Sequence, residues 1–324
     1  MATATIPRTA RPQGRASFVN WFSSADGWAQ ALVFLCATAI LAITGLLVWE
    51  LWTKSQLSRA QFGFSFLTGS DWDPVNLKFG ALPFIFGTVV TSAIALVIAV
   101  PFGVGAAIFL AELAPPKLSD AMTFLIELLA AVPSVIFGLI GIFVLVPILN
   151  QVVPVLKEGG LGMLPIFSGP FYGVSLLSAG VVLSVMVAPY IISVSREVLL
   201  AVPRDLREAA LALGATRWET TWDVVVPGAK RGIMGSVFLA LARALGETMA
   251  VTMVVGNTPK IAASLLAPGY SIASVIANEF AEATSGMQIS VLIELGLVLF
   301  ALTIVLNGAA RLLILATGGK VKAS

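Results

Sequence analysis

The sequence predicts an all-α membrane protein with six transmembrane helices and both termini in the cytoplasm. Two observations support this class. The chain has 324 residues, of which 58% are hydrophobic and only 11% are charged, whereas a soluble domain carries about 25% charged residues. The apolar residues also form long continuous runs, unlike the alternating segments of an outer-membrane barrel. The composition therefore excludes a cytosolic enzyme, a secreted domain and a disordered chain.

The composition also excludes several kinds of site. The chain has no histidine and a single cysteine, Cys36. We therefore expect no metal site, no Ser-His-Asp triad and no other catalytic residues. Cys36 has no partner within the chain for a disulfide, and in an apolar run we expect it to be inert. The formal charge is +2 without a basic tract, so we expect no nucleic-acid partner.

Six apolar runs are long enough for the about 20 residues that a helix needs to cross a bilayer. We predict spans at about 28–52, 82–113, 120–149, 176–202, 233–255 and 289–315. These spans define a cytoplasmic tail at 1–27, a transmembrane domain at 28–316 and a second cytoplasmic tail at 317–324. The first run is too long for the core of a signal peptide, so we interpret it as a retained span.

The distribution of basic residues predicts the orientation. Arg8, Arg11 and Arg15 precede the first span, and most other lysines and arginines fall in the segments that share this side. The opposite segments hold few basic residues, among them Lys54 and Lys260. Because cytoplasmic loops are enriched in lysine and arginine, both termini are expected inside.

The prolines and one outer segment need separate interpretation. Pro101, Pro133, Pro147 and Pro189 fall inside predicted spans, either as tolerated kinks or as breaks around a solute path. In the outer segment, apolar residues at 272–280 recur at helical spacing. This stretch is too short and too polar to span, so we expect it to lie at the membrane interface or to re-enter the bilayer.

The cytoplasmic loop at 203–231 has a pattern of its own. Pro203 suits the start of a helix, and Asp205 favours its positive N-terminal end. Gly214 is a good helix stop, and a second short helix is expected at about 217–225, before Pro227. The loop should therefore form a compact helix, turn and helix on the cytoplasmic face.

The spacing within this loop resembles the EAA loop of ABC-importer permeases. Glu208-Ala209-Ala210, Gly214 and Pro227 match the family pattern EAA, x3, G, x9, I, x, LP, with valine replacing its isoleucine and leucine. The resemblance implies a type I, MetI-like architecture. It also implies that the loop, from Arg204 onward, is the coupling helix that docks into the ATPase subunit.

No ATPase is encoded in the chain itself. The GGKV at 318–321 lacks the glycine spacing and the Ser/Thr of a phosphate-binding loop. ATP and Mg are accordingly expected on a partner ATPase, with no cofactor bound by this chain.

Charged residues inside the predicted spans are candidates for a substrate path. Arg243 and Glu247 lie four residues apart, which predicts that they share a helix face. A bare charge at mid-membrane costs about 2.5–3.5 kcal/mol on insertion scales. The two residues could simply neutralise each other, or the arginine could bind an anion, since its guanidinium fork suits oxyanions. Thr248 and Thr252 could line the same path or pack between helices.

Two further carboxyl groups, Glu127 and Glu294, also lie in predicted spans. Each could hydrogen-bond between helices or act as a proton site. We treat them as possible intramembrane polar sites.

Longer blocks of sequence sharpen the resemblance. They are FLTGSDWDP, FGALPFIFGTVVTS, FLAELAPP, IELLAAVPSVIFG, ALGETMAVTMVVGN, ANEFAEATSG and ELGLVLF. They are similar to phosphate-specific ABC permeases of the PstC type, over most of the chain from span one to span six. The resemblance implies import of inorganic phosphate across the bacterial inner membrane by alternating access. It also implies a homologous PstA-type permease, a PstB-type ATPase dimer and a PstS-type binding protein as partners, and it marks Arg243 and Glu247 as important.

Two alternatives remain open. The EAA loop would also suit an ABC permease for sulfate, molybdate or another oxyanion. An ion-coupled secondary transporter would need no ATPase, and Glu127, Glu247 and Glu294 could then carry protons. A membrane enzyme is a poor alternative because the sequence has no recognisable nucleophile motif.

Overall fold

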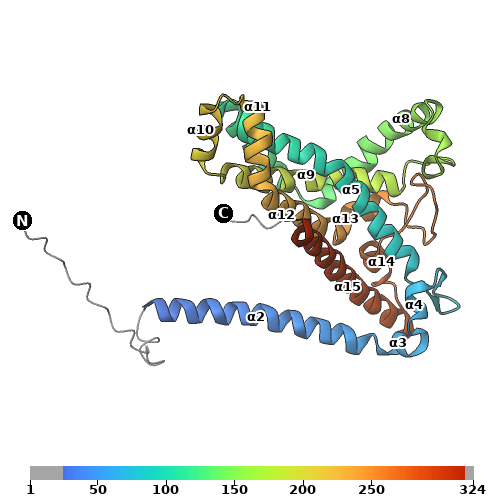
Figure 1. Ribbon diagram of the computed structural model, residues 1–324. Helices are drawn as coiled ribbons and strands as arrows, with labels where there is room; N and C mark the ends of the chain where they lie inside the picture. The colour runs from blue at the N-terminus through green and yellow to red at the C-terminus, as the bar shows by residue number, and fades with distance from the viewer. Residues whose placement is uncertain (1–24, 318–324) are drawn as a thin grey trace, which may run out of the picture. The chain divides into compact units, whose positions relative to one another are not determined.

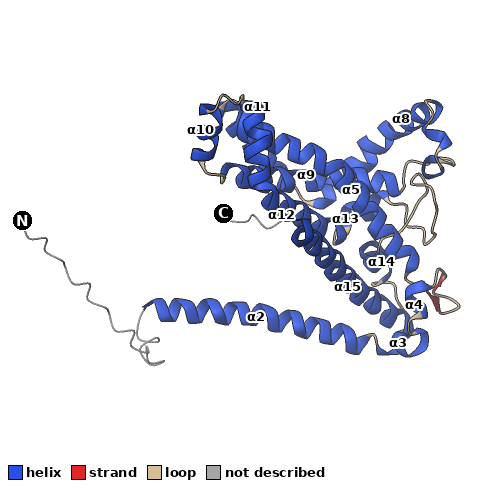
Figure 2. Cartoon of the chain, in the orientation of Figure 1, coloured by secondary structure: helices blue, strands red, loops and turns tan. Residues whose placement is uncertain are grey.

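The computed structural model describes residues 25–317. Its internal contacts divide the chain into two units, residues 1–53 and 54–324. Apart from one antiparallel strand pair, the regular structure of the described residues is helical (Figures 1 and 2). Within residues 25–317, six helices are long and apolar enough to cross a membrane, which confirms the predicted fold class. The basic residues Arg8, Arg11 and Arg15 and most of both predicted tails lie outside the described residues.

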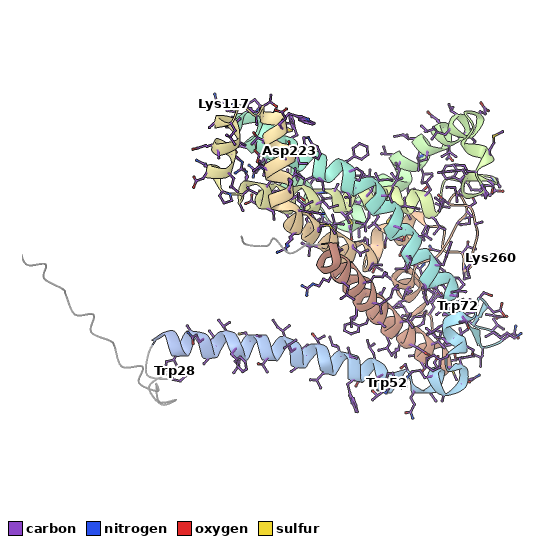
Figure 3. The ribbon with its side chains drawn as sticks, in the orientation of Figure 1. Trp28, Trp52, Trp72, Lys117, Asp223 and Lys260 are labelled. Atoms are coloured by element: carbon purple, nitrogen blue, oxygen red, sulfur yellow. The ribbon has the colours of Figure 1, made fainter. Side chains whose placement is uncertain are left out.

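The described part of the first unit is helix α2 (Ala25–Lys54), whose last residue already belongs to the second unit. Its apolar stretch, Trp28–Lys54, has 27 residues and is therefore about 40 Å long, enough to cross a bilayer. Its isoleucines, most of its leucines and Phe34 are exposed, which is typical of a helix surrounded by lipid. Trp28 and Trp52 lie near its two ends (Figure 3), as interfacial anchors would. Cys36, expected within the apolar run, has an exposed side chain.

Helices α5 (Leu82–Ile108) and α9 (Leu176–Leu200) form the centre of the second unit. Glycine brings their backbones together: a Cβ on Gly180 would lie only 2.5 Å from Ile94 Cγ2, and one on Gly103 would lie 2.9 Å from Ile191 Cγ2. Small residues permit this close approach between membrane helices. Helix α12 (Val226–Leu245) packs against both. Pro101 and Pro189 lie within α5 and α9 without ending them.

The third apolar segment differs from its predicted range of 120–149. Helix α6 (Pro116–Ala130) stops before Pro133. A new helix then begins with α7 (Ser134–Ile140) and continues through the π-helical turn η2 (Gly141–Leu145) into α8 (Val146–Glu158). Proline has no N–H to donate and disfavours helical geometry in the residue before it. The long apolar helix is therefore Ser134–Glu158, and α6 is a separate element.

The fifth apolar segment also differs from its predicted range, 233–255. The short helix α11 (Arg217–Glu219) continues through the π-helical η5 (Thr220–Val225) into α12. The helix stops at Gly246, and a further short helix, α13 (Met249–Val254), follows. The long apolar helix is therefore Arg217–Leu245. Pro227 does not end it, because the proline lies in the first turn of α12.

The end of the second unit that is predicted to face outward has its own core. It holds α3 (Gln56–Phe62), α4 (Ser65–Thr68), the strand pair β1 (Trp72–Asp73) and β2 (Lys78–Phe79), and α14 (Ile272–Glu279). Trp72 pairs with Phe79 in the antiparallel ladder. The Trp72 and Phe84 rings lie 4.6 Å apart edge to face, and the Phe84 and Tyr270 rings lie 5.4 Å apart. Helix α14 coincides with the predicted amphipathic stretch at 272–280.

The remaining elements complete the second unit. Two short 3-10 turns, η3 (Leu161–Met163) and η4 (Pro165–Phe167), follow α8. The last apolar helix is α15 (Gly286–Thr317). Lys117 and Asp223 lie at one end of this unit, and Trp72 and Lys260 lie at the other (Figure 3). This separation agrees with the sides of the membrane to which the sequence assigned their segments.

Candidate functional site

The loop at 203–231 has the predicted helix, glycine turn and second helix. Helix α10 (Arg204–Ala212) begins directly after Pro203. Gly214 has a positive φ of +93°, which a residue with a side chain rarely adopts. Thr216 then caps α11: its hydroxyl accepts from the Glu219 N–H at 3.3 Å, and the Glu219 carboxylate accepts from the Thr216 N–H at 2.7 Å. This reciprocal capping fixes where the second helix begins.

The outer face of α10 is open to a partner. Arg204, Glu208 and Ala209 are exposed, and Ala210 is half-buried. Gly214 and Pro227 are exposed as well. Leu213, at the turn, is 91% exposed, although a leucine outside the bilayer is normally covered. The loop thus presents small and apolar side chains on a rigid support, as a docking surface requires.

The inner side of α10 is tied to the membrane helices by a residue that the sequence analysis did not identify. The Arg207 guanidinium forms an ion pair with Glu112, with Nη2 and Oε1 2.8 Å apart. Glu112 lies in the π-helical turn η1 (Phe109–Leu113), which continues α5. The two residues are 95 positions apart, so no local spacing in the sequence could have paired them.

Arg243, the predicted centre of the substrate path, lies in the last turn of α12. Its guanidinium carbon is 4.3 Å from the centroid of the Tyr190 ring. Its Nε is buried and has no hydrogen-bond partner among the described residues. The Tyr190 hydroxyl donates to the carbonyl of Ala130 at 3.0 Å, a carbonyl that has no partner within α6 because the helix ends there. Tyr190 therefore links the cation to the break between α6 and α7.

Arg243 and Glu247 do not share a helix face as predicted, and the ion pair that was one of the two alternatives for them is not present among residues 25–317. Glu247 Oε1 instead accepts from the N–H of Ala250 at 3.3 Å. The i, i+4 rule holds only within a continuous helix, and α12 ends between the two residues, at Gly246. Glu247 thus serves as a cap for α13 rather than as a counter-charge.

The two predicted threonines form bonds within their own segment. The Thr248 hydroxyl donates to the Gly246 carbonyl at 3.3 Å, and the Thr252 hydroxyl donates to the Thr248 carbonyl at 2.7 Å. Both side chains are half-buried. Their hydroxyls support the broken backbone next to Arg243, and each oxygen can still accept a hydrogen bond.

The breaks in the third and fifth apolar segments lie next to packed helices. Helix α13 packs against α7, and a Cβ on Gly138 would lie 2.5 Å from the Met253 sulfur. Arg243 precedes α13, and the Ala130 carbonyl precedes α7. Tyr190 of α9 joins the two, so three segments that are distant in the sequence meet at the arginine.

Of the other two predicted polar sites, Glu127 is exposed and Glu294 is buried. Glu127 is exposed and lies on α6, so it is not inside one of the six long apolar helices, contrary to expectation. Glu294 lies inside α15 and is 6% exposed, and its Oε2 has no hydrogen-bond partner among the described residues. One turn earlier on α15, the Ser290 hydroxyl accepts from the Ser58 N–H at 3.1 Å. Glu294 therefore lies in the polar contact between α3 and α15.

One more carboxyl group at the outward end was missed by the sequence analysis. Both oxygens of Glu279 accept from Trp72 Nε1, each at 3.1 Å. Burial raises the pKa of Glu279 above its usual value, although the Trp72 bond opposes the change. The contact fastens the strand pair to α14. No group of three or more metal-ligating side chains occurs in the part of the chain that the structure describes.

A family model described as "Binding-protein-dependent transport system inner membrane component" matches residues 99–317. The phosphate transport system permease protein PstC of Mesorhizobium japonicum is 45% identical over 305 residues, which cover 93% of each chain. The chain belongs to the family of binding-protein-dependent transport system inner membrane components. Its PstC relative from Pasteurella multocida is 48% identical over 87% of each chain, and the one from Haemophilus influenzae is 47% identical over 87% of this chain and 89% of its own.

Among solved structures, one similar chain comes from the MetNI methionine ABC transporter in inward-facing conformations. It is 19% identical, with a TM-score of 0.46, over 72% of this chain and 93% of that chain.

Membership of the family makes the chain an inner-membrane permease component of a binding-protein-dependent transport system.

Proposed function

We propose that this chain is the membrane-spanning subunit of an ATP-driven importer that moves inorganic phosphate into the cytoplasm by alternating access. The substrate assignment rests on relatives that are 45%, 48% and 47% identical and are named as phosphate transport permeases. The same relationship supports a PstA-type permease, a PstB-type ATPase dimer and a PstS-type binding protein as partners. ATP and Mg are bound by the ATPase subunit.

Arg243 is the residue that we propose to meet the phosphate. An arginine in a membrane helix is costly unless it is paired or faces a polar path, and Arg243 forms no ion pair with a carboxylate among residues 25–317. The Tyr190 ring stabilises the cation through its face. A ring face does not use the N–H groups of the guanidinium fork, so these remain free to donate to an oxyanion.

Glu247 contributes to this site indirectly in the proposed mechanism. Its hydrogen bond to the Ala250 N–H holds the turn between α12 and α13, and the position of Arg243 depends on where α12 ends. Thr248 follows in this turn, Thr252 lies one helical turn later in α13, and both offer hydroxyl oxygens along the path. The anion therefore meets one permanent positive charge and several neutral polar groups, which bind it without trapping it.

The exposed face of α10 is the proposed docking element for the ATPase. Glu208 and Ala209 are exposed on a short helix, and Gly214 permits the turn that ends it. Closure of the ATPase dimer on ATP would displace this helix. The displacement would change the arrangement of the transmembrane helices, so that the path around Arg243 opens to one side of the membrane at a time.

The experiment that tests this function is uptake of labelled phosphate by proteoliposomes containing the complete complex. Uptake that needs ATP, the ATPase subunit and the binding protein would support the proposal. Transport of sulfate or molybdate in place of phosphate would overturn the substrate assignment. Transport driven by an ion gradient, without the ATPase subunit, would overturn the ATP-driven mechanism and favour a secondary transporter.

A further inference from the structure

The Arg207–Glu112 pair is a half-buried contact with well-defined geometry. Arg207 Nη2 and Glu112 Oε1 are 2.8 Å apart, and Arg207 Nε donates to Glu112 Oε2 at 3.3 Å. The two side chains are only 17% and 11% exposed. Two parallel bonds between a guanidinium and a carboxylate fix the orientation of both groups. The contact therefore holds α10 at a defined angle to the end of α5.

The same guanidinium also binds the end of α9. Arg207 Nη2 donates to the carbonyl of Leu199 at 2.7 Å, and Nη1 donates to the carbonyl of Val202. The last carbonyls of a helix lack partners within it and attract cations. One side chain of the loop thus joins three elements: α10, the end of α9 and the turn η1 that continues α5.

The Arg207 contact is the direct side-chain link between α10 and the end of α5. The backbone of α10 packs mainly against η5, which belongs to the same loop. Helices α5 and α9, by contrast, pack closely along their length through Gly103 and Gly180. A movement of α10 can reach α9 through residues 201–203 and α12 through η5, and Arg207 adds a direct side-chain contact to α9 and to η1.

We propose that Arg207 and Glu112 form a joint that carries movement of the coupling loop directly to the α5–α9 pair. The inference rests on the proposed function of α10 as the docking element for an ATPase. Arg207 acts here as a positioning residue and does not touch the substrate. The directional bonds are essential, because they transmit rotation as well as translation of α10.

The first test compares the coupling of transport to ATP hydrolysis in variants of the reconstituted complex. Arg207→Gln and Glu112→Gln should each lower phosphate uptake per ATP hydrolysed by tenfold or more, while ATP hydrolysis continues. The double variant should be no worse than either single variant, because both remove the same joint. Lys117→Gln removes an exposed positive charge from the same end of the unit and should leave coupling unchanged. Independent, additive losses in the double variant would overturn the inference.

A second variant separates the joint from simple structural support, and it remains informative if a single substitution prevents assembly. Replacing the pair by Arg207→Met with Glu112→Leu keeps the site filled without its charges, a kind of exchange that buried ion pairs often tolerate. This variant should assemble and hydrolyse ATP but remain uncoupled. Wild-type coupling in this variant would mean that packing alone suffices, and would overturn the inference.

A distance measurement tests the joint without reference to any substrate. Spin labels at Leu213→Cys on the loop and Phe102→Cys on α5, in a Cys36→Ser background, should give one narrow distance distribution. The distribution should broaden in the Arg207→Gln variant and stay narrow in Lys117→Gln. A distance distribution in Arg207→Gln as narrow as in the wild type would overturn the inference that Arg207 holds α10 in place.

Failure of the wild type to transport phosphate would instead count against the proposed function alone.

Discussion

The guanidinium of Arg243 lies over the ring of Tyr190, with its central carbon 4.3 Å from the ring centroid. The tyrosine is itself held in place by the bond from its hydroxyl to the Ala130 carbonyl. A cation that would be costly in a membrane is thus stabilised without a carboxylate. This arrangement keeps the positive charge of Arg243 available to an anion.

Substitutions of Tyr190 separate the roles of its ring and its hydroxyl. Tyr190→Leu removes the aromatic face, and a desolvated cation–π contact contributes about 2 kcal/mol, so uptake should fall about tenfold or more. Tyr190→Phe keeps the face and loses only the bond to the Ala130 carbonyl, so its uptake should fall by a few-fold at most. Initial rates of phosphate uptake measure both. Equal rates for Leu and Phe would contradict a role for the ring.

Glu247→Gln should affect transport much less than a substitution of Arg243. The amide oxygen of glutamine can still accept from the Ala250 N–H, so the cap of α13 is retained. If the two side chains formed a functional ion pair, the two neutral variants would have similar defects. The measurement is uptake by Glu247→Gln and Arg243→Gln at matched levels of assembled complex, and similar losses would contradict the observed geometry.

The close contact between α5 and α9 predicts a difference between two glycines. Gly180→Ala places a methyl group 2.5 Å from Ile94 Cγ2, and such overpacking costs about 1–3 kcal/mol. Gly105→Ala, on α5, meets no heavy atom within 4 Å and should leave stability unchanged or raise it slightly. Thermal unfolding of the purified complex in detergent compares them. A Gly180→Ala variant as stable as Gly105→Ala would contradict the packing.

The outward end of the second unit should respond to pH through Glu279. Burial raises its pKa in the folded chain above the usual 4.5, so the folded state keeps its proton to higher pH than the unfolded state. The contribution of this group to stability is therefore fully present below about pH 4.5 and is lost as pH rises through the folded-state pKa. Glu279→Gln should flatten this part of the stability profile while keeping an acceptor for Trp72. If stability depended on pH in the same way in Glu279→Gln as in the wild type, Glu279 would not be the group responsible.

The sequence predicted what depends on local patterns. Continuous apolar runs predicted six long helices, and the loop spacing predicted α10, the Gly214 turn and α11. The ends of the third and fifth segments were wrong because proline and glycine inside an apolar run are compatible with either a kink or a break. In the structure both are breaks: α6 ends before Pro133 and α12 ends at Gly246. Hydropathy alone carries no information about this choice.

The central contacts of both sites could not be predicted. Arg243 was identified because a charge inside an apolar run is conspicuous, but its partner Tyr190 lies on another helix, α9, and no local spacing links the two. Arg207 looked like an ordinary solvated charge within the loop, and Glu112 lies 95 residues away. Only the fold brings these pairs together. The prediction that Arg243 and Glu247 share a helix face was wrong because the i, i+4 rule holds only within a continuous helix, and α12 ends between the two residues.

The most direct test of the account is ATP-dependent uptake of labelled phosphate by proteoliposomes that carry the complete complex. Wild type, Arg243→Gln and the control Lys117→Gln would be compared at equal ATPase activity. We predict that wild type and Lys117→Gln accumulate phosphate at the same rate. Arg243→Gln should assemble and hydrolyse ATP but accumulate phosphate at least tenfold more slowly. Uptake by Arg243→Gln at the wild-type rate would contradict the central claim that this arginine forms part of the anion path.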